Sequence, residues 1–199
     1  MGILQDNKAE RDEKAIDYTL ANSNNLLLIF TRNPELGKGK RRLAATVGDE
    51  AALHIYQFLL NHTVKITSHL YAEKLVYYSE EIWQKDIWDN SRYGKKLQQG
   101  NDLGVRMANA FKEGFQNEFQ KIIIIGSDMF DLSQKDIEQA FKALEKNDFV
   151  VGPAEDGGYY LLGMNNYMPE LFKNKVWGTD TVLKDTLTDL KDKKTAILE

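Results

Sequence analysis

Acidic, basic and glycine residues gather in three short stretches of this sequence, each beside an apolar run. The clearest is "KIIIIGSDMFDLS" (121–133), where Asp128 lies two residues beyond a predicted strand over 121–126. A carboxylate held at a strand end can bind Mg²⁺ or Mn²⁺, and that metal can bridge the oxygens of a diphosphate. Asp131 also follows the strand, but it stands before a predicted helix, whose N-terminus favours an acid. We predict a functional role for Asp128 and a capping role for Asp131.

The second stretch is rich in cations, although the chain as a whole is acidic. "FTRNPELGKGKRRLA" (30–44) places five cations within eleven residues, and glycines at 37 and 39 allow a backbone to approach a ligand. A basic, glycine-containing loop that leads into a helix suits a phosphate group. It is not a Walker A loop, because Arg41 follows Gly39-Lys40 where that motif has Ser or Thr. A solvated basic turn is the alternative interpretation.

The third stretch, "GPAEDGGYYLLG" (152–163), joins two acids and two glycines to a predicted strand. Asp156-Gly157 is typical of a hairpin turn. A turn alone does not require Glu155 or Gly158, and two successive glycines suit a backbone that lies against a ligand. The stretch is therefore either a simple turn or a ligand-facing loop, with Asp156 beside the ligand.

The periodicity of the chain predicts the elements that position these stretches. Continuous apolar runs predict buried strands, and apolar residues three or four apart predict helices. The helix over 48–69 would bury Ala52, Ile55, Leu59 and Val64. Alternating strands and helices predict an α/β, Rossmann-like fold with a mostly parallel sheet covered on both faces, which binds ligands at the carboxyl ends of its strands. The predicted strands are 26–31, 74–79, 121–126, 148–152 and 159–164, and the predicted helices are 48–69, 102–117, 137–144 and about 180–191.

Composition excludes several classes of protein. The 199 residues predict one domain over 25–199 after a polar extension over 1–24. A net charge of −4 argues against nucleic acid as a partner, and the lack of cysteine excludes disulfides, thiol catalysis and thiolate zinc sites. No apolar run approaches the ~20 residues of a membrane span, and the N-terminus has no signal-peptide pattern. We expect a cytoplasmic protein; the sequence carries no signal for its oligomeric state.

Histidine and tryptophan residues give weaker signals. His54, His62 and His69 lack the spacing of a metal pair, so we predict structural or surface roles for them. Trp83 and Trp88 could form the floor of a sugar site, but packing against the core is the favoured interpretation.

Five motifs together carry a resemblance to a known family. "FTRNPELGKGKRRLA", "QGNDLGVRM", "IIIIGSDMFDLS", "VGPAEDGGYYLLGM" and "WGTDTVL" occur in this order between residue 26 and about residue 198. The pattern is similar to the DUF2064 proteins of bacteria. These are glycosyltransferase-A-like and related to the molybdenum-cofactor and lactyl-phosphate guanylyltransferases.

The resemblance implies a nucleotide-diphospho-sugar transferase (GT-A) fold and a role for each motif. Asp128 would be the metal-binding acid and, with Asp156, a catalytic residue, while Asp180 would be a second ligand of Mg²⁺ or Mn²⁺. Glu155, Gly157 and Gly158 would form the sugar or acceptor side. The nucleotide would be bound by Thr31, Arg32, Lys40, Arg42, Asp102 and Arg106.

The chain departs from the family pattern in three places. Arg41 stands where the family usually has Thr, and Phe130 where it usually has Pro. The chain also ends at "TAILE", before an acidic segment common in the family, so we expect that a C-terminal segment is lacking.

Three functions remain open at this stage. The first is a metal-dependent glycosyltransferase that uses a nucleotide-diphospho-sugar. The second is a nucleotidyltransferase that moves a nucleoside monophosphate from a triphosphate to a small phosphorylated acceptor. The third is a non-catalytic nucleotide-binding protein. In all three, the expected partner is a nucleotide or a nucleotide sugar.

Overall fold

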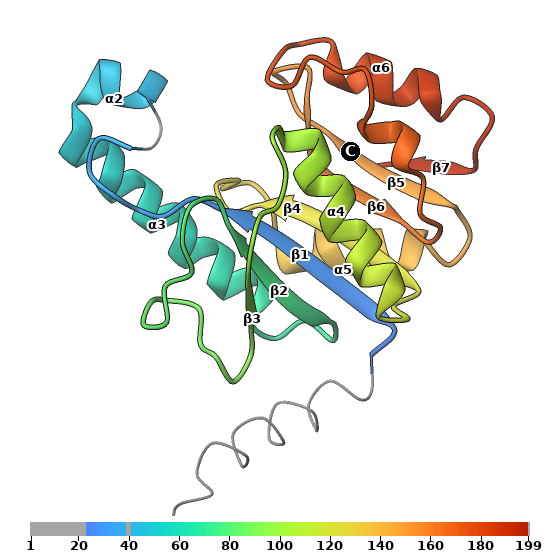
Figure 1. Ribbon diagram of the computed structural model, residues 1–199, viewed down its shortest axis with the longest axis horizontal. Coiled ribbons are helices and arrows are strands. Elements are labelled where there is room, and N and C mark those ends of the chain that lie inside the picture. The colour runs from blue at the N-terminus through green and yellow to red at the C-terminus, as the bar shows by residue number, and fades with distance from the viewer. Residues whose placement is uncertain (1–22, 39–40, 199) are drawn as a thin grey trace, which may run out of the picture.

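The computed structural model describes residues 23–38 and 41–198, which are coloured in Figure 1. Lys40 and nearly all of the predicted extension over 1–24 lie outside the described residues. Within the described chain, no helix is long and apolar enough to cross a bilayer.

A seven-stranded sheet forms the centre of the molecule, and β6 is its one reversed strand. The strand order is β3-β2-β1-β4-β6-β5-β7, and every pairing is parallel except the two that β6 makes, with β4 and with β5. The mostly parallel α/β sheet is therefore confirmed. The strands are β1 (Asn25–Thr31), β2 (Glu73–Tyr78), β3 (Gly94–Leu97), β4 (Lys121–Gly126), β5 (Phe149–Pro153), β6 (Tyr159–Met164) and β7 (Thr195–Ile197).

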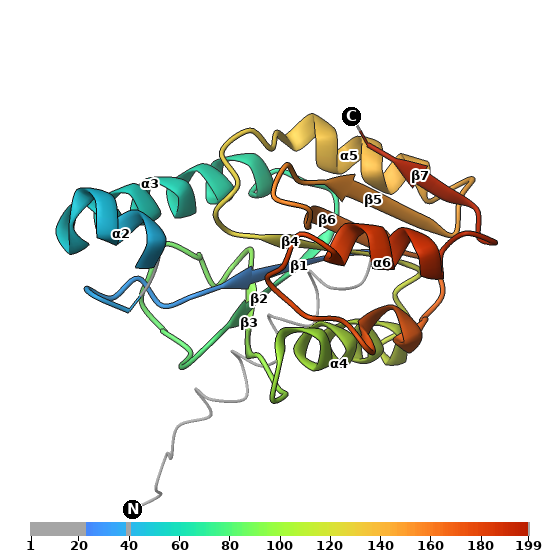
Figure 2. The ribbon, with the colours of Figure 1, turned by 90° about the horizontal axis from the view of Figure 1, so that it is seen from above.

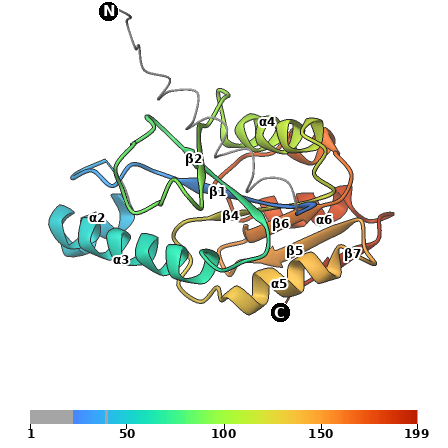
Figure 3. The same cartoon turned by 90° about the horizontal axis from the view of Figure 1, so that it is seen from below.

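Helices cover both faces of this sheet (Figures 2 and 3). On one face lie α3 (Asp49–Thr67) and α5 (Gln134–Ala143), and on the other lie α4 (Leu103–Gln116), α6 (Val182–Asp189) and the short 3₁₀ helix η1 (Pro169–Phe172). The short helix α2 (Arg41–Val47) precedes α3 and packs against it.

The two central strands supply the core of both layers. Leu27 and Ile29 of β1 face the cluster under α3 and α5, while Leu26 and Leu28 face the cluster under α4. The isoleucines of β4 alternate in the same way. Because both faces are buried, these strands read as continuous apolar runs rather than as alternating ones.

The buried face of α3 differs from the predicted stripe. Ala52 is buried as expected, but Ile55 is 40% exposed, and Tyr56 and Leu60 point into the core instead. A rotation of the predicted face by about one residue explains the difference. It brings the Tyr56 hydroxyl to the end of β1.

The predicted N-cap of α5 at Ser133 is confirmed, whereas Asp131 does not cap this helix. Ser133 accepts from the Asp136 N–H, and the Asp136 carboxylate accepts from the Ser133 N–H at 2.9 Å, which forms a capping box. The prediction that Asp131 caps the helix is therefore wrong, since the reciprocal pair already satisfies the helix N-terminus.

Candidate functional site

The three stretches with polar motifs meet at one edge of the sheet. Phe30 of β1 is in register with Gly126 of β4, so the segments after both strands leave the sheet side by side. Because β6 runs opposite to its neighbours, the turn between β5 and β6 reaches the same edge, where it begins β6 at Tyr159. This is the edge at which parallel α/β sheets bind ligands.

A buried cluster of hydroxyls joins the ends of β1 and β4. Ser127 Oγ donates to Thr31 Oγ1 at 2.9 Å, and the Tyr56 hydroxyl lies 3.2 Å from Ser127 Oγ. The Arg32 N–H donates to the same Tyr56 oxygen at 2.9 Å. Tyr56 of α3 therefore fixes the backbone just before Arg32 and just before Asp128. Thr31 is 3% exposed, so its hydroxyl belongs to this cluster, and a nucleotide contact by Thr31 stays a prediction.

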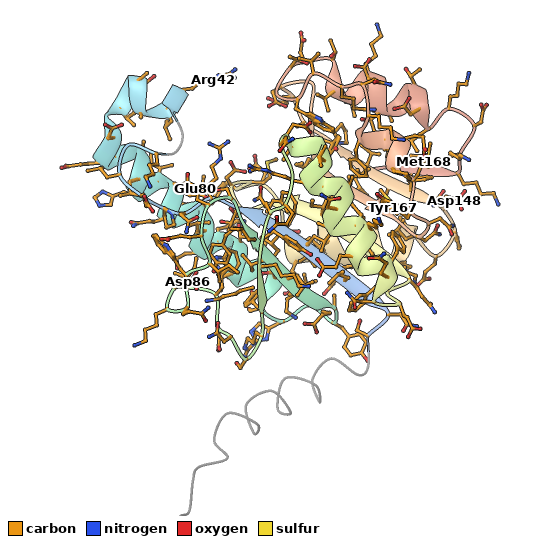
Figure 4. All side chains as sticks on the ribbon, viewed as in Figure 1. Arg42, Glu80, Asp86, Asp148, Tyr167 and Met168 are labelled. Carbon is orange, nitrogen blue, oxygen red and sulfur yellow. The ribbon has the colours of Figure 1, made fainter. Side chains whose placement is uncertain are left out.

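The basic loop after β1 offers exposed cations at this edge. Arg32 is exposed directly beyond β1, and Arg42 is exposed on the first turn of α2, where Figure 4 shows it extending outward. Lys38 differs, because Glu35 and Glu80 pair with it and raise the pKa of its ammonium group. Lys38 is exposed too, but its charge is shared with these two acids, so Arg32 and Arg42 are the described cations of this stretch that we assign to a phosphate group.

Asp128 is exposed two residues beyond β4, as the sequence predicts. One of its carboxylate oxygens lies 3.0 Å from the position that a Cβ on Gly126 would occupy. The carboxylate therefore turns back toward Gly126, which lines a pocket beside the strand end.

The stretch over 154–158 is a hairpin turn and also a wall of that pocket. Ala154 N–H donates to Gly158 O at 3.0 Å, and Gly158 N–H donates to the Asp156 carboxylate at 3.1 Å. Asp156 and Gly158 line the pocket, and Glu155 is exposed. The two interpretations of the sequence are thus compatible.

Gly157 is required by the conformation of the turn, and a ligand contact by Gly157 stays a prediction. Its φ is 82°, in the left-handed region, and a Cβ at this position would collide with the backbone of Asp180. Its carbonyl accepts from the Leu183 N–H at 2.8 Å. The turn is thereby docked onto the start of α6, which places the segment of Asp180 next to that of Asp156.

The pocket itself has a volume of about 220 Å³ and lies between the sheet and the helices α4 and α6. Its walls are mainly apolar and aromatic. The lining residues are Phe30, Leu103, Met107, Ile124, Ile125, Gly126, Asp156, Gly158, Tyr159, Tyr160, Trp177, Gly178, Thr179 and Val182.

Trp177 is one of the lining residues that the sequence did not predict. It was visible in the motif at 177–183, but only Asp180 was singled out there. Its indole packs on Gly104, where any Cβ would collide with the ring. Trp88, in contrast, is 2% exposed and packs edge-to-face on Tyr93, so the packing role expected of it is confirmed.

Asp102 and Arg106 organise the segment before α4. The Asp102 carboxylate accepts from Val105 N–H at 2.9 Å as the helix N-cap. Arg106 donates to Gly100 O at 3.0 Å and to the side chain of Gln98, which in turn donates to Thr31 O at 3.2 Å. Nucleotide contact by Asp102 and Arg106 stays a prediction beside these structural roles.

Among the described residues, the side chains that could hold a metal ion are few at this edge of the sheet. Within residues 23–38 and 41–198, no group of three or more His, Asp or Glu side chains is placed to hold an ion. Asp128 and Asp180 are exposed carboxylates on segments that adjoin the pocket. Mg²⁺ usually keeps waters and takes substrate phosphates beside one or two carboxylates. Metal ligation by Asp128 and Asp180 stays a prediction.

Comparisons with known proteins identify the family and the fold of this chain. The family model of DUF2064, described as uncharacterized proteins conserved in bacteria, matches residues 63–179. A crystal structure from Desulfovibrio desulfuricans G20, of a protein provisionally named a nucleotide-diphospho-sugar transferase, is 28% identical with a TM-score of 0.83. The match covers 89% of this chain and 80% of that one.

More distant structures share the fold alone. A cytidylyltransferase from Leptospira borgpetersenii is 11% identical with a TM-score of 0.55, over 89% of this chain and 76% of that one. The 4-diphosphocytidyl-2C-methyl-D-erythritol synthase of Anaerococcus prevotii is 10% identical with a TM-score of 0.51, over 93% and 88%. No curated protein matches this sequence. The nucleotide-diphospho-sugar transferase fold expected from the sequence is thus confirmed.

Proposed function

This chain belongs to the DUF2064 family. From that premise we propose that it is a transferase that acts on a nucleotide-activated substrate. More specifically, we propose a metal-dependent glycosyltransferase that binds a nucleotide-diphospho-sugar. The observation that carries the proposal is the meeting of the basic, Asp128 and Asp156 segments at one edge of the sheet. There Asp156 and Gly158 line a pocket together with Gly126, and the carboxylate of Asp128 lies beside Gly126. The similarity to the Desulfovibrio structure supports the same class of donor.

The charged residues at the edge of the sheet would bind the donor and the acceptor at different places. Arg32 and Arg42, with Lys40 expected beside them, would bind the negative diphosphate, because guanidinium groups bind phosphate oxygens strongly and directionally. Asp128 and Asp180 would hold Mg²⁺ or Mn²⁺, which when bound neutralises charge that develops on the leaving diphosphate. The Tyr56 hydroxyl cluster keeps the backbones that carry Arg32 and Asp128 in register.

Asp156 would act as the general base of the reaction. Its exposed carboxylate on the pocket wall would accept the proton of an acceptor hydroxyl. The acceptor oxygen then bonds to the anomeric carbon of the sugar, the bond from that carbon to the diphosphate oxygen breaks, and the nucleoside diphosphate leaves. Glu155, Gly157 and Gly158 form the turn that carries this carboxylate.

Ligand-induced stabilisation tests the proposal directly. A nucleotide sugar at a hundred times its Kd, with Mn²⁺, should stabilise the protein by about 2.7 kcal/mol, and the metal-dependent part should vanish in Asp128→Asn. Asp131→Asn is the matched control, since Asp131 is an exposed acid of the same segment, whereas it is the Asp128 carboxylate that turns back toward Gly126 of the pocket. Absence of any shift across nucleoside diphosphates, triphosphates and nucleotide sugars would refute nucleotide binding.

The product separates this function from its alternatives. A glycosyltransferase releases a nucleoside diphosphate from the nucleotide sugar. Release of pyrophosphate from a triphosphate would instead establish the nucleotidyltransferase reaction. Binding without either product would establish a non-catalytic nucleotide-binding protein.

A further inference from the structure

We propose that the pocket between β4, β6, α4 and α6 binds an uncharged, ring-bearing alcohol, and that this alcohol is the acceptor of the transfer reaction. The role of this alcohol as the acceptor rests on the proposed function, whereas the binding of a ring-bearing alcohol in the pocket does not. The inference starts from the size of the pocket. At about 220 Å³ it holds one substituted ring, because a cavity of about 150 Å³ already accommodates benzene.

The charge of the pocket excludes phosphate as its occupant. Among the described residues, no lysine or arginine lines it, and its one charged lining residue is the acid Asp156. A phosphate group here would be desolvated beside a carboxylate without a partner cation, which is strongly unfavourable. The cations Arg32 and Arg42 instead lie on the loop after β1 and on the first turn of α2. The diphosphate and the occupant of the pocket therefore bind different parts of the edge.

The polar groups of the walls argue against a nucleobase. The Tyr159 hydroxyl points to the Met107 sulfur, 3.8 Å away, and burial raises the pKa of Tyr159, which keeps that hydroxyl neutral. The Thr179 hydroxyl donates to Val176 O at 2.7 Å. A nucleobase carries several donors and acceptors on its edge, and each one buried without a partner costs affinity. A ring with a single hydroxyl avoids that cost.

Aromatic walls and one carboxylate define the orientation of the alcohol. Trp177, Phe30 and Tyr159 offer ring surfaces on which a flat apolar group can pack. Asp156 offers the hydrogen-bond acceptor for one hydroxyl at the wall formed by the turn. This arrangement aims the hydroxyl oxygen toward the strand end that carries Asp128.

Indole N–H signals in nuclear magnetic resonance test the proposal with benzyl alcohol as the probe. The chain has three tryptophans, of which Trp177 lines the pocket while Trp88 is buried in the opposite layer. Benzyl alcohol should shift the Trp177 signal and leave those of Trp83 and Trp88 unchanged. Inorganic phosphate should shift none of the three. Trp177→Phe assigns the signal.

Leu103→Arg is the variant that divides the outcomes. Leu103 is 44% exposed on the pocket rim, so the substitution leaves the core intact. We expect benzyl alcohol to bind about ten-fold more weakly to Leu103→Arg, while Leu187→Arg, on the exposed side of α6, should bind it like the wild type. Tighter phosphate binding by Leu103→Arg together with no benzyl alcohol shift in the wild type would overturn the proposal.

Nucleosides complete the test. If uridine, cytidine, adenosine or guanosine moves the Trp177 signal more than benzyl alcohol does, the pocket binds the base of the donor and the acceptor assignment is wrong. Nucleotide-induced stabilisation without a benzyl alcohol shift would defeat this inference and leave the glycosyltransferase proposal standing. A benzyl alcohol shift without nucleotide binding would support the ring-binding site and would contradict the glycosyltransferase proposal.

Discussion

Two irregular segments of the molecule use the same residue types for opposite purposes. In the segment between β2 and β3, the Asp86 carboxylate accepts from the Tyr78 hydroxyl, from Lys95 Nζ at 2.7 Å and from Trp88 N–H at 3.0 Å. In the turn between β5 and β6, the Asp156 carboxylate is exposed and accepts from its own turn. Figure 4 labels Asp86 in the loop between β2 and β3 and Arg42 on α2.

The tryptophans of the two regions differ in the same way as the two carboxylates. Trp88 is enclosed by the core, whereas Trp177 forms one wall of a cavity. A carboxylate saturated by protein donors stabilises the chain, and one left at a pocket wall is available to a ligand. Variants of the first region should therefore change stability most, and variants of the second should change ligand response most.

The largest loss of stability is expected for Asp86→Ala. Lys95 and Asp86 have side chains only 6% and 11% exposed, so removal of the acid leaves a buried ammonium and should lower the free energy of unfolding by about 3–5 kcal/mol. Urea unfolding measures this loss. The nucleotide-induced shift, taken below the new melting temperature, should be retained. If the free energy of unfolding fell by less than about 1 kcal/mol, the Asp86–Lys95 pair would contribute no more than an exposed salt bridge does.

Gly157→Val should come next, at about 3 kcal/mol, because it combines a left-handed φ with a collision against Asp180. Gly48→Val is the matched control: Gly48 has φ 85°, but a Cβ there would meet nothing within 4 Å. The difference between the two variants in urea unfolding isolates the collision. Equal losses would show that α6 moves aside to admit the side chain.

Tyr56→Phe should cost about 1–2 kcal/mol, since it removes a hydroxyl that bonds to Arg32 N–H within a buried cluster. Tyr93→Phe removes a comparable buried hydroxyl, bonded to Thr67 at 2.8 Å far from the sheet edge. Both variants should lose similar stability, but Tyr56→Phe alone should weaken stabilisation by nucleotide with Mn²⁺. If both variants respond to nucleotide like the wild type, Tyr56 has no positioning role.

The smallest loss of stability is expected for Asp156→Asn, within about 0.5 kcal/mol, because the side chain is exposed and the amide can still accept from Gly158 N–H. Its metal-dependent response to a nucleotide sugar should fall more than its response to the bare nucleotide. Asp131→Asn is the control, since Asp131 is an exposed acid outside this turn and outside the pocket lining. Identical responses of wild type and Asp156→Asn would leave the turn with a structural role only.

The sequence predicted those parts of the fold whose signal is local. Strand β4 and strand β6 have the predicted bounds, and the turn before β6 and the position of Asp128 beyond β4 follow from them. Buried runs and turn residues depend on neighbours in the chain, which is why single-sequence patterns reveal them.

Features that depend on distant partners escaped prediction. Strand β3 contains Lys95 and Lys96, whose charges pair with Asp86 and Glu113 from other segments, so its sequence carries no apolar pattern. The roles of Tyr56 and Trp177 likewise depend on Ser127 and Gly104, each more than 70 residues away in the chain. Such contacts arise only when the sheet has assembled.

The docking of the turn onto α6 has a consequence for how the protein would report an occupied pocket. Because the Leu183 N–H donates to Gly157 O, that amide can exchange its hydrogen with solvent only when the turn and the helix separate. A molecule resting against both segments opposes that separation. The hydrogen-exchange rate of the Leu183 amide should therefore fall when the pocket is occupied, whatever reaction the protein catalyses.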